Sequence, residues 1–326
     1  MKNHQKLRLR NHINHIQNYK LSLFDVFIKK TENDEIYVRG LNREIKKLVF
    51  YFRKNNIRVW QLEEALGIKK HSINWWYDQG MPLSHLFNIK KIYNNTFKKG
   101  LPQKNIILSL RGSHHNIKIP KLNRKLAYVT GYLYGDGTLS SYKKGERLEF
   151  YDISKEYLEY TASNITNLFN IKTYSIKKDK RKECFQLRFN NKLLVLFFNK
   201  VFEVPIGKKK GKSKIPEIIK DSSYVLDFIS GFFDAEGHVY YTPEYGYRIS
   251  CAQCDNLFLK EISDALFKLK IANKITNYRS RIYELRISNK ENFYKFLSIF
   301  KLKHPAKTSR IKLALEKKST IKHKRN

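Results

Sequence analysis

One short pattern occurs twice in this 326-residue chain, at positions one hundred residues apart. Residues 126–139 read LAYVTGYLYGDGTL, and residues 226–239 read LDFISGFFDAEGHV. Each copy is an apolar stretch of helical length that ends in an acid followed directly by a glycine, with Asp136 as the first acid and Glu236 as the second. Duplication of a segment predicts a chain built from two similar structural repeats.

Small residues recur within each copy at a spacing of about one helical turn. The first copy has Gly131 and Gly135 at i and i+4. The second copy has Gly231 and Ala235 at the equivalent positions. Residues at this spacing lie on one face of a helix, which is thereby freed of side-chain bulk. The pattern therefore predicts two helices that pack closely through Gly131 and Gly231.

The acids end these helices, and that position is unfavourable for a carboxylate. The helix dipole already puts negative partial charge at the carboxyl end, where the following glycine suits a left-handed cap. A divalent cation that bridges Asp136 and Glu236 would reverse the penalty, since hard cations prefer oxygen ligands. The neighbouring carbonyls of Gly135 and Ala235 could complete the ligand set. We predict that the helix pair delivers two carboxylates to one metal-dependent centre.

On these motifs the chain resembles the LAGLIDADG homing endonucleases, in the single-chain form with two copies of the motif, over roughly residues 122–315. The resemblance implies an α+β fold of two pseudo-symmetric αββαββα repeats joined by the helix pair. It implies a monomeric nuclease that uses Mg²⁺ (or Mn²⁺), held by Asp136 and Glu236, to break double-stranded DNA at a long asymmetric site, as in intron homing. The family often has an acid two residues before the metal-binding one. Asp234 matches this pattern in the second copy, whereas the first copy has Tyr134. The position is usually structural.

The same resemblance implies further catalytic residues. Residues 205–216, PIGKKKGKSKIP, resemble the segment that carries a catalytic lysine in the first half, where we select Lys209. In the second half the segment KLKHPAKTS offers Lys303 and Lys307, of which we prefer Lys307. Gln253 resembles the polar residue that orders a water after the strand. Its counterpart, sought near residues 153–154, is not glutamine.

Alternating strands are predicted near the end of each repeat, where QLRFNNK at 186–192 parallels ELRISNK at 284–290. Apolar residues point to one face and polar residues to the other. The resemblance implies that the polar face enters the major groove of DNA, where Arg and Gln recognise guanine and adenine edges. The candidate base-reading residues are Gln186, Arg188, Glu284 and Arg286. The alternative is an ordinary solvated sheet face.

The charge of the chain favours a polyanionic partner. It has 65 Lys and Arg against 29 Asp and Glu, a net charge of +36 and a pI near 9.9. Biased genome composition is the competing explanation for the many lysines. The excess of basic over acidic residues is, however, too large for such a bias to be the better explanation. Lys208 and Lys210 flank Lys209 and are candidate contacts for DNA phosphates.

Four short helices are predicted before the duplicated part, at residues 42–52, 59–66, 71–79 and 83–93. The stretch EALGIKKHSINWWYDQGMP resembles the repressor-like helix-turn-helix, with Ala65, Gly67 and Ile73 where that family packs its two core helices. In that family the second helix enters the major groove. The exposed DNA-contact candidates are Lys69, Lys70, His71, Ser72 and Asn74. The alternative is a small helical bundle that serves only for packing.

These observations divide the chain into five parts. We expect a basic N-terminal extension at 1–38, an all-α helix-turn-helix domain at 39–97, a basic linker at 98–121, a first repeat at 122–220, and a second repeat with a basic tail at 221–326. The three cysteines fit a reducing compartment, and neither a secretion signal nor a membrane-spanning run is evident. We expect a non-secreted protein in the cytoplasm or on the nucleoid, with no membrane contact.

Two alternatives compete with a free-standing or intron-encoded nuclease. A catalytically inactive descendant could act as an RNA maturase, with RNA as its partner, or as a DNA-binding transcriptional regulator. The presence of both Asp136 and Glu236 favours the nuclease. An intein-embedded nuclease is the other alternative, and it is disfavoured on the expectation that an intein would begin with a splicing nucleophile and end in His-Asn.

Overall fold

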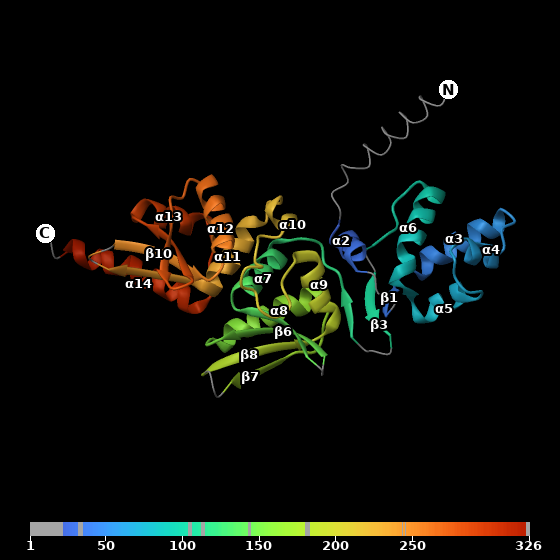
Figure 1. Ribbon diagram of the computed structural model, residues 1–326, viewed down its shortest axis with the longest axis horizontal. Helices are drawn as coiled ribbons and strands as arrows, with labels where there is room; N and C mark the ends of the chain where they lie inside the picture. Colours follow the sequence, from blue (N-terminus) through green and yellow to red (C-terminus); the bar gives the residue numbers. More distant parts are fainter. Residues whose placement is uncertain are drawn as a thin grey trace, which may run out of the picture.

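The computed structural model describes residues 22–31, 35–103, 106–111, 115–142, 145–179, 183–242, 244 and 246–323, with only the backbone described from residue 317 onward. The N-terminal elements lie at one end of the long axis, a first repeat lies in the middle, and a second repeat lies at the other end (Figure 1). Among the described residues, no helix is long and apolar enough to cross a membrane.

The first repeat is a four-stranded antiparallel sheet with three helices. Its elements in chain order are α7 (Arg124–Gly135), β5 (Gly137–Tyr142), β6 (Gly145–Asp152), α8 (Lys155–Phe169), β7 (Ser175–Asp179), β8 (Cys184–Asn190) and α9 (Lys192–Phe202). The strand order is β5-β6-β8-β7. The short helix α10 (Glu217–Lys220) lies between this repeat and the next.

The second repeat has the same construction. Its elements are α11 (Val225–Glu236), β9 (Gly237–Thr242), β10 (Gly246–Gln253), α12 (Asn256–Lys268), β11 (Lys274–Arg279), β12 (Ile282–Ser288) and α13 (Lys290–Ile299), followed by α14 (Pro305–His323). The strand order β9-β10-β12-β11 matches that of the first repeat. The predicted pair of αββαββα repeats is confirmed.

Matching caps begin the corresponding helices of the two repeats. The Ser154 side chain accepts a hydrogen bond from the third residue of α8, and the Asp255 side chain does the same for α12, at 3.2 and 3.3 Å. Asn191 and Asn289 cap α9 and α13 in the same way, at 3.1 and 2.9 Å. Side-chain caps of this kind satisfy amide groups that have no partner within the helix.

The two repeats meet along α7 and α11, whose backbones touch. A Cβ atom placed on Gly131 would overlap the carbonyl oxygen of Phe228, and one on Gly231 would overlap the carbonyl oxygen of Tyr128. Every residue of α7 from Leu126 to Tyr134 is buried. The duplicated motif therefore forms the interface between the repeats, with glycine at each point of backbone contact.

Within the described residues, nine elements precede the first repeat. They are α2 (Leu23–Lys30), β1 (Ile36–Arg39), α3 (Asn42–Lys54), α4 (Val59–Ala65), α5 (Ser72–Gln79), β2 (Met81–Pro82), α6 (Leu83–Phe97), β3 (Ile107–Leu110) and β4 (Asn116–Lys118). The helices α3 to α6 lie close to the positions expected from the sequence. Their end residues differ by at most four positions from the expected ones.

The expectation of an all-α N-terminal domain needs correction. The strands form a sheet in the order β2-β1-β3-β4, so the segment 98–121, expected to be a linker, supplies β3 and β4. These strands are two to four residues long, which is too short for an alternating pattern to be recognised against the surrounding sequence. The sheet instead becomes evident from the long-range pairing of β1 with β3.

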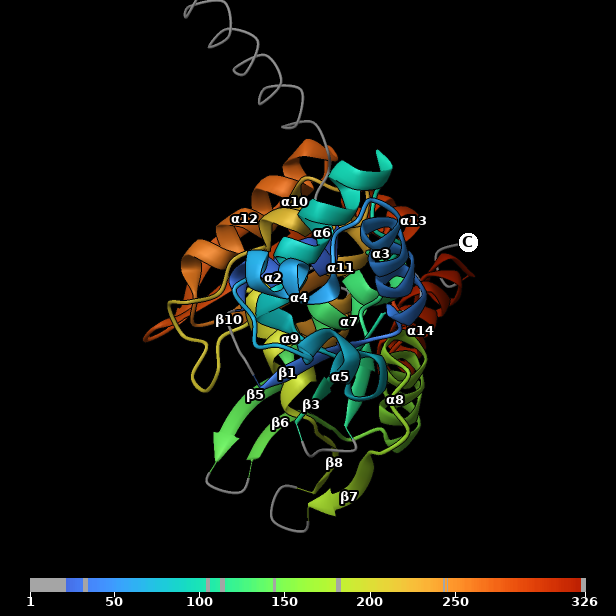
Figure 2. The ribbon, with the colours of Figure 1, turned by 90° about the vertical axis from the view of Figure 1, so that its right-hand side faces the viewer.

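The described part of the segment 1–38 contains α2, which packs on α9 of the first repeat (Figure 2). The rings of Phe27 and Phe197 lie 6.2 Å apart between centroids. Lys30 forms an ion pair with Glu203 at 2.8 Å, just beyond α9. The N-terminal part is thus attached to the first repeat by an aromatic contact and a charged one.

The glycine contacts generate a stability prediction. Gly131→Ala and Gly231→Ala should each lower the free energy of unfolding by about 1 to 3 kcal/mol or more, because the added methyl group overlaps a backbone carbonyl that cannot move alone. Gly100→Ala is the control, since nothing lies within 4 Å of a Cβ there. Denaturant unfolding measures the effect. Equal midpoints for the three variants and the parent would contradict this close helix contact.

Candidate active site

The two motif acids lie at the carboxyl ends of the paired helices. Asp136 directly follows α7, and Glu236 is the last residue of α11. The helix ends are so close that a Cβ on Gly135 would lie 3.2 Å from the Cγ of Glu236. Both acid side chains are partly buried. The structure therefore brings together the two carboxylates that the sequence analysis selected.

Burial and neighbouring charge shift both carboxyl groups towards the neutral form. Burial, with repulsion from Asp152, raises the pKa of Asp136 to about 6. Burial, with repulsion from Asp136, raises the pKa of Glu236 to about 7. Lys209 and Lys307 oppose both shifts. The site therefore holds two carboxyl groups close together, and the positive charges of the two lysines compensate for them only in part.

Lys209 covers the end of α7. Its Nζ donates to the carbonyl oxygens of Leu133, Tyr134 and Gly135, at 3.0, 2.8 and 2.5 Å. These are among the final carbonyls of a helix, which have no amide partner within it. Burial lowers the pKa of Lys209 to about 8, while Glu236 and Asp136 act in the opposite direction.

Lys307 covers the end of α11 in the equivalent manner. Its Nζ donates to the carbonyl oxygen of Ala235 at 3.4 Å and to that of Gly237. Burial lowers the pKa of Lys307, and attraction to Asp136 opposes the shift. The alternative candidate, Lys303, points elsewhere, because its Nζ donates to the Tyr160 hydroxyl at 2.9 Å. One lysine thus stands at each helix end, as the sequence analysis selected.

Gln253 contacts the second acid directly, since its Nε2 donates to Oε1 of Glu236 at 2.6 Å. The register identifies its counterpart in the first repeat. Gly137 pairs with Phe150, and Gly237 pairs with Cys251, so Asp152 occupies the place of Gln253. The expected position near residues 153–154 was wrong because the β9–β10 hairpin has one more loop residue than the β5–β6 hairpin. Aligning the two strand pairs would have found Asp152.

The donors at the helix ends fit a hard divalent cation. Two carboxylates and the carbonyls of Gly135 and Ala235 offer only oxygen, which Mg²⁺ prefers. In this structure the lysines also engage those carbonyls. Within the described ranges, no three His, Cys, Asp or Glu side chains form a cluster suited to a metal ion. The remaining ligands of a cation would therefore have to come from backbone, water or substrate oxygens.

The polar face of the first sheet is a hydrogen-bonded network. Arg188 Nε pairs with Oε1 of Glu149 at 2.9 Å, and Arg188 Nη2 donates to Oε1 of Gln186 at 2.9 Å. Gln186 Nε2 donates to Oε1 of Glu149 at 3.1 Å and to the Tyr151 hydroxyl at 2.5 Å. Two of the base-reading candidates are therefore already bonded to a buried carboxylate.

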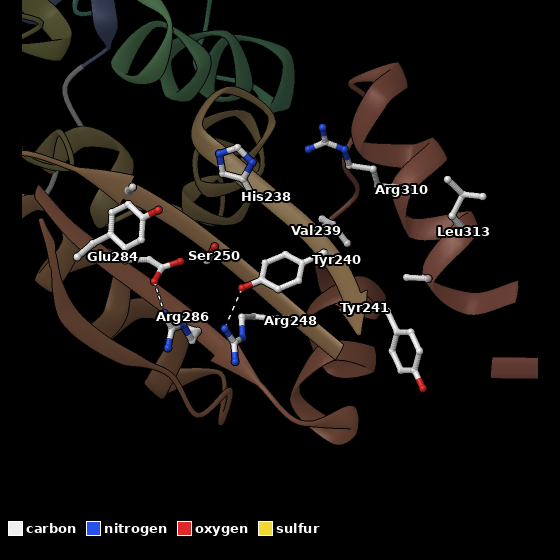
Figure 3. Close-up of a pocket in the computed structure, with 13 residues that line it drawn as sticks. His238, Val239, Tyr240, Tyr241, Arg248, Ser250, Glu284, Arg286, Arg310 and Leu313 are labelled. Atoms are coloured by element: carbon white, nitrogen blue, oxygen red, sulfur yellow. Dashed lines mark hydrogen bonds and ion pairs between the residues drawn. The ribbon is translucent and has the colours of Figure 1, made fainter. Parts of the chain in front are cut away.

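The polar face of the second sheet forms one wall of a cavity of about 620 Å³, and α14 forms another (Figure 3). Arg286 pairs with Glu284 at 2.5 Å, and Arg248 donates to the Tyr240 hydroxyl at 3.0 Å. Arg310 reaches from α14 towards the sheet (Figure 3). This face carries two guanidinium groups, and a third faces it from α14.

The helix-turn-helix candidates surround the start of α5. Lys69, Lys70, His71 and Asn74 are exposed, whereas Ser72 is half-buried and Ile73 and Trp76 are buried. The buried Glu63 carboxylate accepts from the amides of His71 and Ile73, each at 3.0 Å, and so caps this helix from α4. Lys208 and Lys210 are exposed as well. The exposed positions could contact an anionic partner, and a DNA-binding role for them stays a prediction.

Comparison with known proteins bears on the duplicated part. Residues 223–301, which include α11 to α13, match the LAGLIDADG-like domain family. The first repeat has the same motif, the same elements and the same strand order. The second repeat is therefore a LAGLIDADG-like domain, and the first repeat shares its architecture.

Longer proteins contain segments similar to this chain. A probable translation initiation factor IF-2 of Methanocaldococcus jannaschii is 24% identical over 310 residues, which are 88% of this chain and 24% of that protein. One component of the A-type ATP synthase of Pyrococcus abyssi is 33% identical over 125 residues, which are 37% of this chain and 12% of that protein. The chain spans about a quarter or less of these relatives.

A solved structure of mesophilic variants of the homing endonuclease I-DmoI is similar in fold. It has a TM-score of 0.43 and 22% identity, and the match covers 54% of this chain and 94% of that chain.

The raised pKa values predict how stability depends on pH. A carboxyl group whose pKa is higher in the folded state binds more protons there, so Asp136 and Glu236 should each contribute a loss of stability to the metal-free protein as pH rises from about 4 to about 7. Glu236→Gln should remove its share, on the order of 1 kcal/mol, and melt higher than the parent at pH 7.5 in chelator. Thermal unfolding across this pH range measures the difference.

A magnesium titration completes that test. Mg²⁺ should raise the melting temperature of the parent more than that of Glu236→Gln, because a ligand stabilises the state that binds it. Asp221→Asn, which alters an exposed acid, is the control and should behave as the parent. A pH dependence that is the same in Glu236→Gln and the parent would contradict the assigned electrostatics.

Proposed function

We propose that this LAGLIDADG-type protein is a site-specific DNA endonuclease that makes a metal-dependent double-strand break at a long asymmetric site. The observation that carries the proposal is the paired arrangement of one acid and one lysine at the end of each motif helix. A double-strand break requires two phosphodiesters to be cut on opposite strands. Two helices packed through glycine supply two such sets of groups at a short separation.

The residues of the chain would perform most of the chemistry by position and charge. Lys209 and Lys307 carry charge into a buried, acidic site, where an ammonium group can neutralise negative charge that develops on a phosphate. Gln253 holds Glu236 with its amide nitrogen and keeps its amide oxygen available to orient a water. Asp136 and Glu236 would hold Mg²⁺ or Mn²⁺, which when bound stabilises charge on the phosphate oxygens.

The differences between the repeats suit a target without two-fold symmetry. The first sheet presents Gln186 and Arg188, whereas the second presents Glu284 and Arg286. Arginine favours guanine and glutamine favours adenine, while glutamate accepts from cytosine. A duplex laid across both faces would therefore meet different side chains in its two halves. The net charge of +36 supports double-stranded DNA as the partner.

The relatives favour a second setting for the same activity. The similar segments make up 24% of an initiation factor and 12% of an ATP synthase component, and those names denote unrelated activities. We infer that the shared part is a module carried within longer proteins, as in an intein-embedded nuclease. A catalytically inactive maturase or regulator remains the rival to both settings, and loss of cleavage with retained nucleic-acid binding would favour it.

Cleavage of a randomised duplex library tests the proposal. Asp136→Asn and Glu236→Gln should each reduce double-strand cleavage in Mg²⁺ by about 100-fold or more, since removal of a metal ligand costs several kcal/mol. DNA affinity in Ca²⁺ should not fall, because loss of a carboxylate reduces repulsion of phosphate. Asp221→Asn should cut as the parent does. A variant without both acids that still cuts would refute the assignment.

Base reading can be separated from general attraction. Arg286→Ala should relax preference at a few positions and cost about 1 to 3 kcal/mol there, whereas Lys208→Ala should weaken all sequences evenly and flatten the salt slope by about one. Arg188→Ala is compared in a Glu149→Gln background and Arg286→Ala in a Glu284→Gln background, so that no buried carboxylate loses its partner. Affinity selection at several salt concentrations measures both effects. An even loss of affinity in Arg286→Ala would contradict base reading.

A further inference from the structure

His304 lies between the second repeat and α14, and it is buried with 5% of its surface exposed. Its ring joins two parts of the chain that are far apart in sequence. Nε2 lies 3.0 and 3.1 Å from the two carboxylate oxygens of Asp152, at the end of β6 in the first repeat. Nδ1 accepts from the amide of Ala306 at 3.1 Å, in the first turn of α14.

The contact with Ala306 determines the proton position on the ring. A backbone amide can only donate, so Nδ1 must act as an acceptor and carry no proton. Nε2 then carries the proton of the imidazole and donates it to Asp152. A single neutral tautomer of His304 therefore satisfies both contacts.

The backbone of His304 is fixed as well. Its amide donates to Oδ1 of Asp234 at 3.1 Å, next to the Lys303 amide, which donates to Oδ2 at 2.7 Å. Its carbonyl accepts from the amides of Lys307 and Thr308, each at 3.0 Å. The amides that begin α14 are thus bonded to His304, and His304 is bonded to both repeats.

Asp152 is a suitable anchor because its other contacts are rigid. It accepts from the Tyr132 hydroxyl at 2.9 Å, in α7, and from the Ser154 amide at 2.7 Å. The carboxylate is buried with 8% of the residue exposed. With Asp152 held on two sides, His304 has a fixed partner for its ring proton.

We propose that His304 is a positioning residue: by bonding α14 to Asp152 of the first repeat, it places Lys307 at the carboxyl end of α11. Lys307 lies in the first turn of α14, two residues after Pro305, so a shift of this turn shifts its Nζ. The catalytic meaning of that placement rests on the proposed nuclease function. The placement itself is a statement about the fold.

Lys209 is supported in a related way by the opposite repeat. The amide of Ser213, four residues after Lys209, donates to Oδ2 of Asp255 at 3.1 Å, in the second repeat. The hydroxyl of Ser213 also lies 3.4 Å from the carbonyl of Lys209. Each lysine thus follows the last helix of its own repeat and is secured by an acid of the other. In the second case the connection runs through a histidine.

Hydrogen exchange tests the placement without any need for cleavage. Asp152→Ala should speed exchange of the amides of Ala306, Lys307 and Thr308 by about 10-fold or more, because their acceptor loses its anchor. Asp152→Asn should exchange as the parent does, since its amide oxygen still accepts from Nε2. Glu146→Ala, at the other end of β6, is the matched control. Unchanged exchange in Asp152→Ala, or equally fast exchange in Asp152→Asn, would overturn the proposal.

A kinetic arm tests the link to Lys307. The assay is single-turnover nicking, with DNA affinity measured separately in Ca²⁺. Asp152→Ala should slow cutting by about 10-fold. The double variant Asp152→Ala/Lys307→Ala should cut no more slowly than Lys307→Ala alone. Multiplicative losses would overturn the proposed route through Lys307. If the parent protein cuts no DNA, the proposed function fails, and the exchange experiment still decides whether His304 places Lys307.

Discussion

The contact between the backbones of α7 and α11 is the constraint on which the rest of the structure depends. Gly131 and Gly231 let each helix touch a carbonyl of the other, and this closeness brings the two helix ends together. Bringing two carboxyl ends together is electrostatically unfavourable, since each carries negative partial charge and an acid. Lys209 and Lys307 offset this by bonding the terminal carbonyls. The site therefore results from a packing contact that requires cations.

This requirement gives the lysines two connected roles. As donors they satisfy carbonyls that a helix leaves without partners, and as charges they moderate the pKa values of Asp136 and Glu236. In the proposed function the same carboxylates and carbonyls would hold a divalent cation, which would supply charge stabilisation at the scissile phosphate. The lysines would supply positive charge beside that phosphate from the same helix ends.

The sequence predicted those parts of the molecule that are duplicated. Two copies of one motif defined the helix pair, and the second short repeat located β8 and β12. Asp152 and His304 escaped prediction because the first depends on a one-residue difference between hairpins, and the second depends on a contact between repeats. The strands β1 to β4 escaped because pairing, and not local pattern, creates them. Local periodicity carries no information about either kind of long-range contact.

The arginines of the sheet faces show why a correct residue type does not settle its function. Arg188 donates from Nε to Glu149 and from Nη2 to Gln186. These two bonds leave Nη1 as the remaining nitrogen of the guanidinium group. A bidentate contact with guanine would have to break or share one of them, which sets a cost against each base contact. The same bonds hold the guanidinium in one orientation and reduce the entropy lost on binding. Discrimination between bases by this face therefore depends on two opposing effects. The bonds of Arg188 hold its guanidinium group in place for a base, and Glu149 competes with the base for the same group.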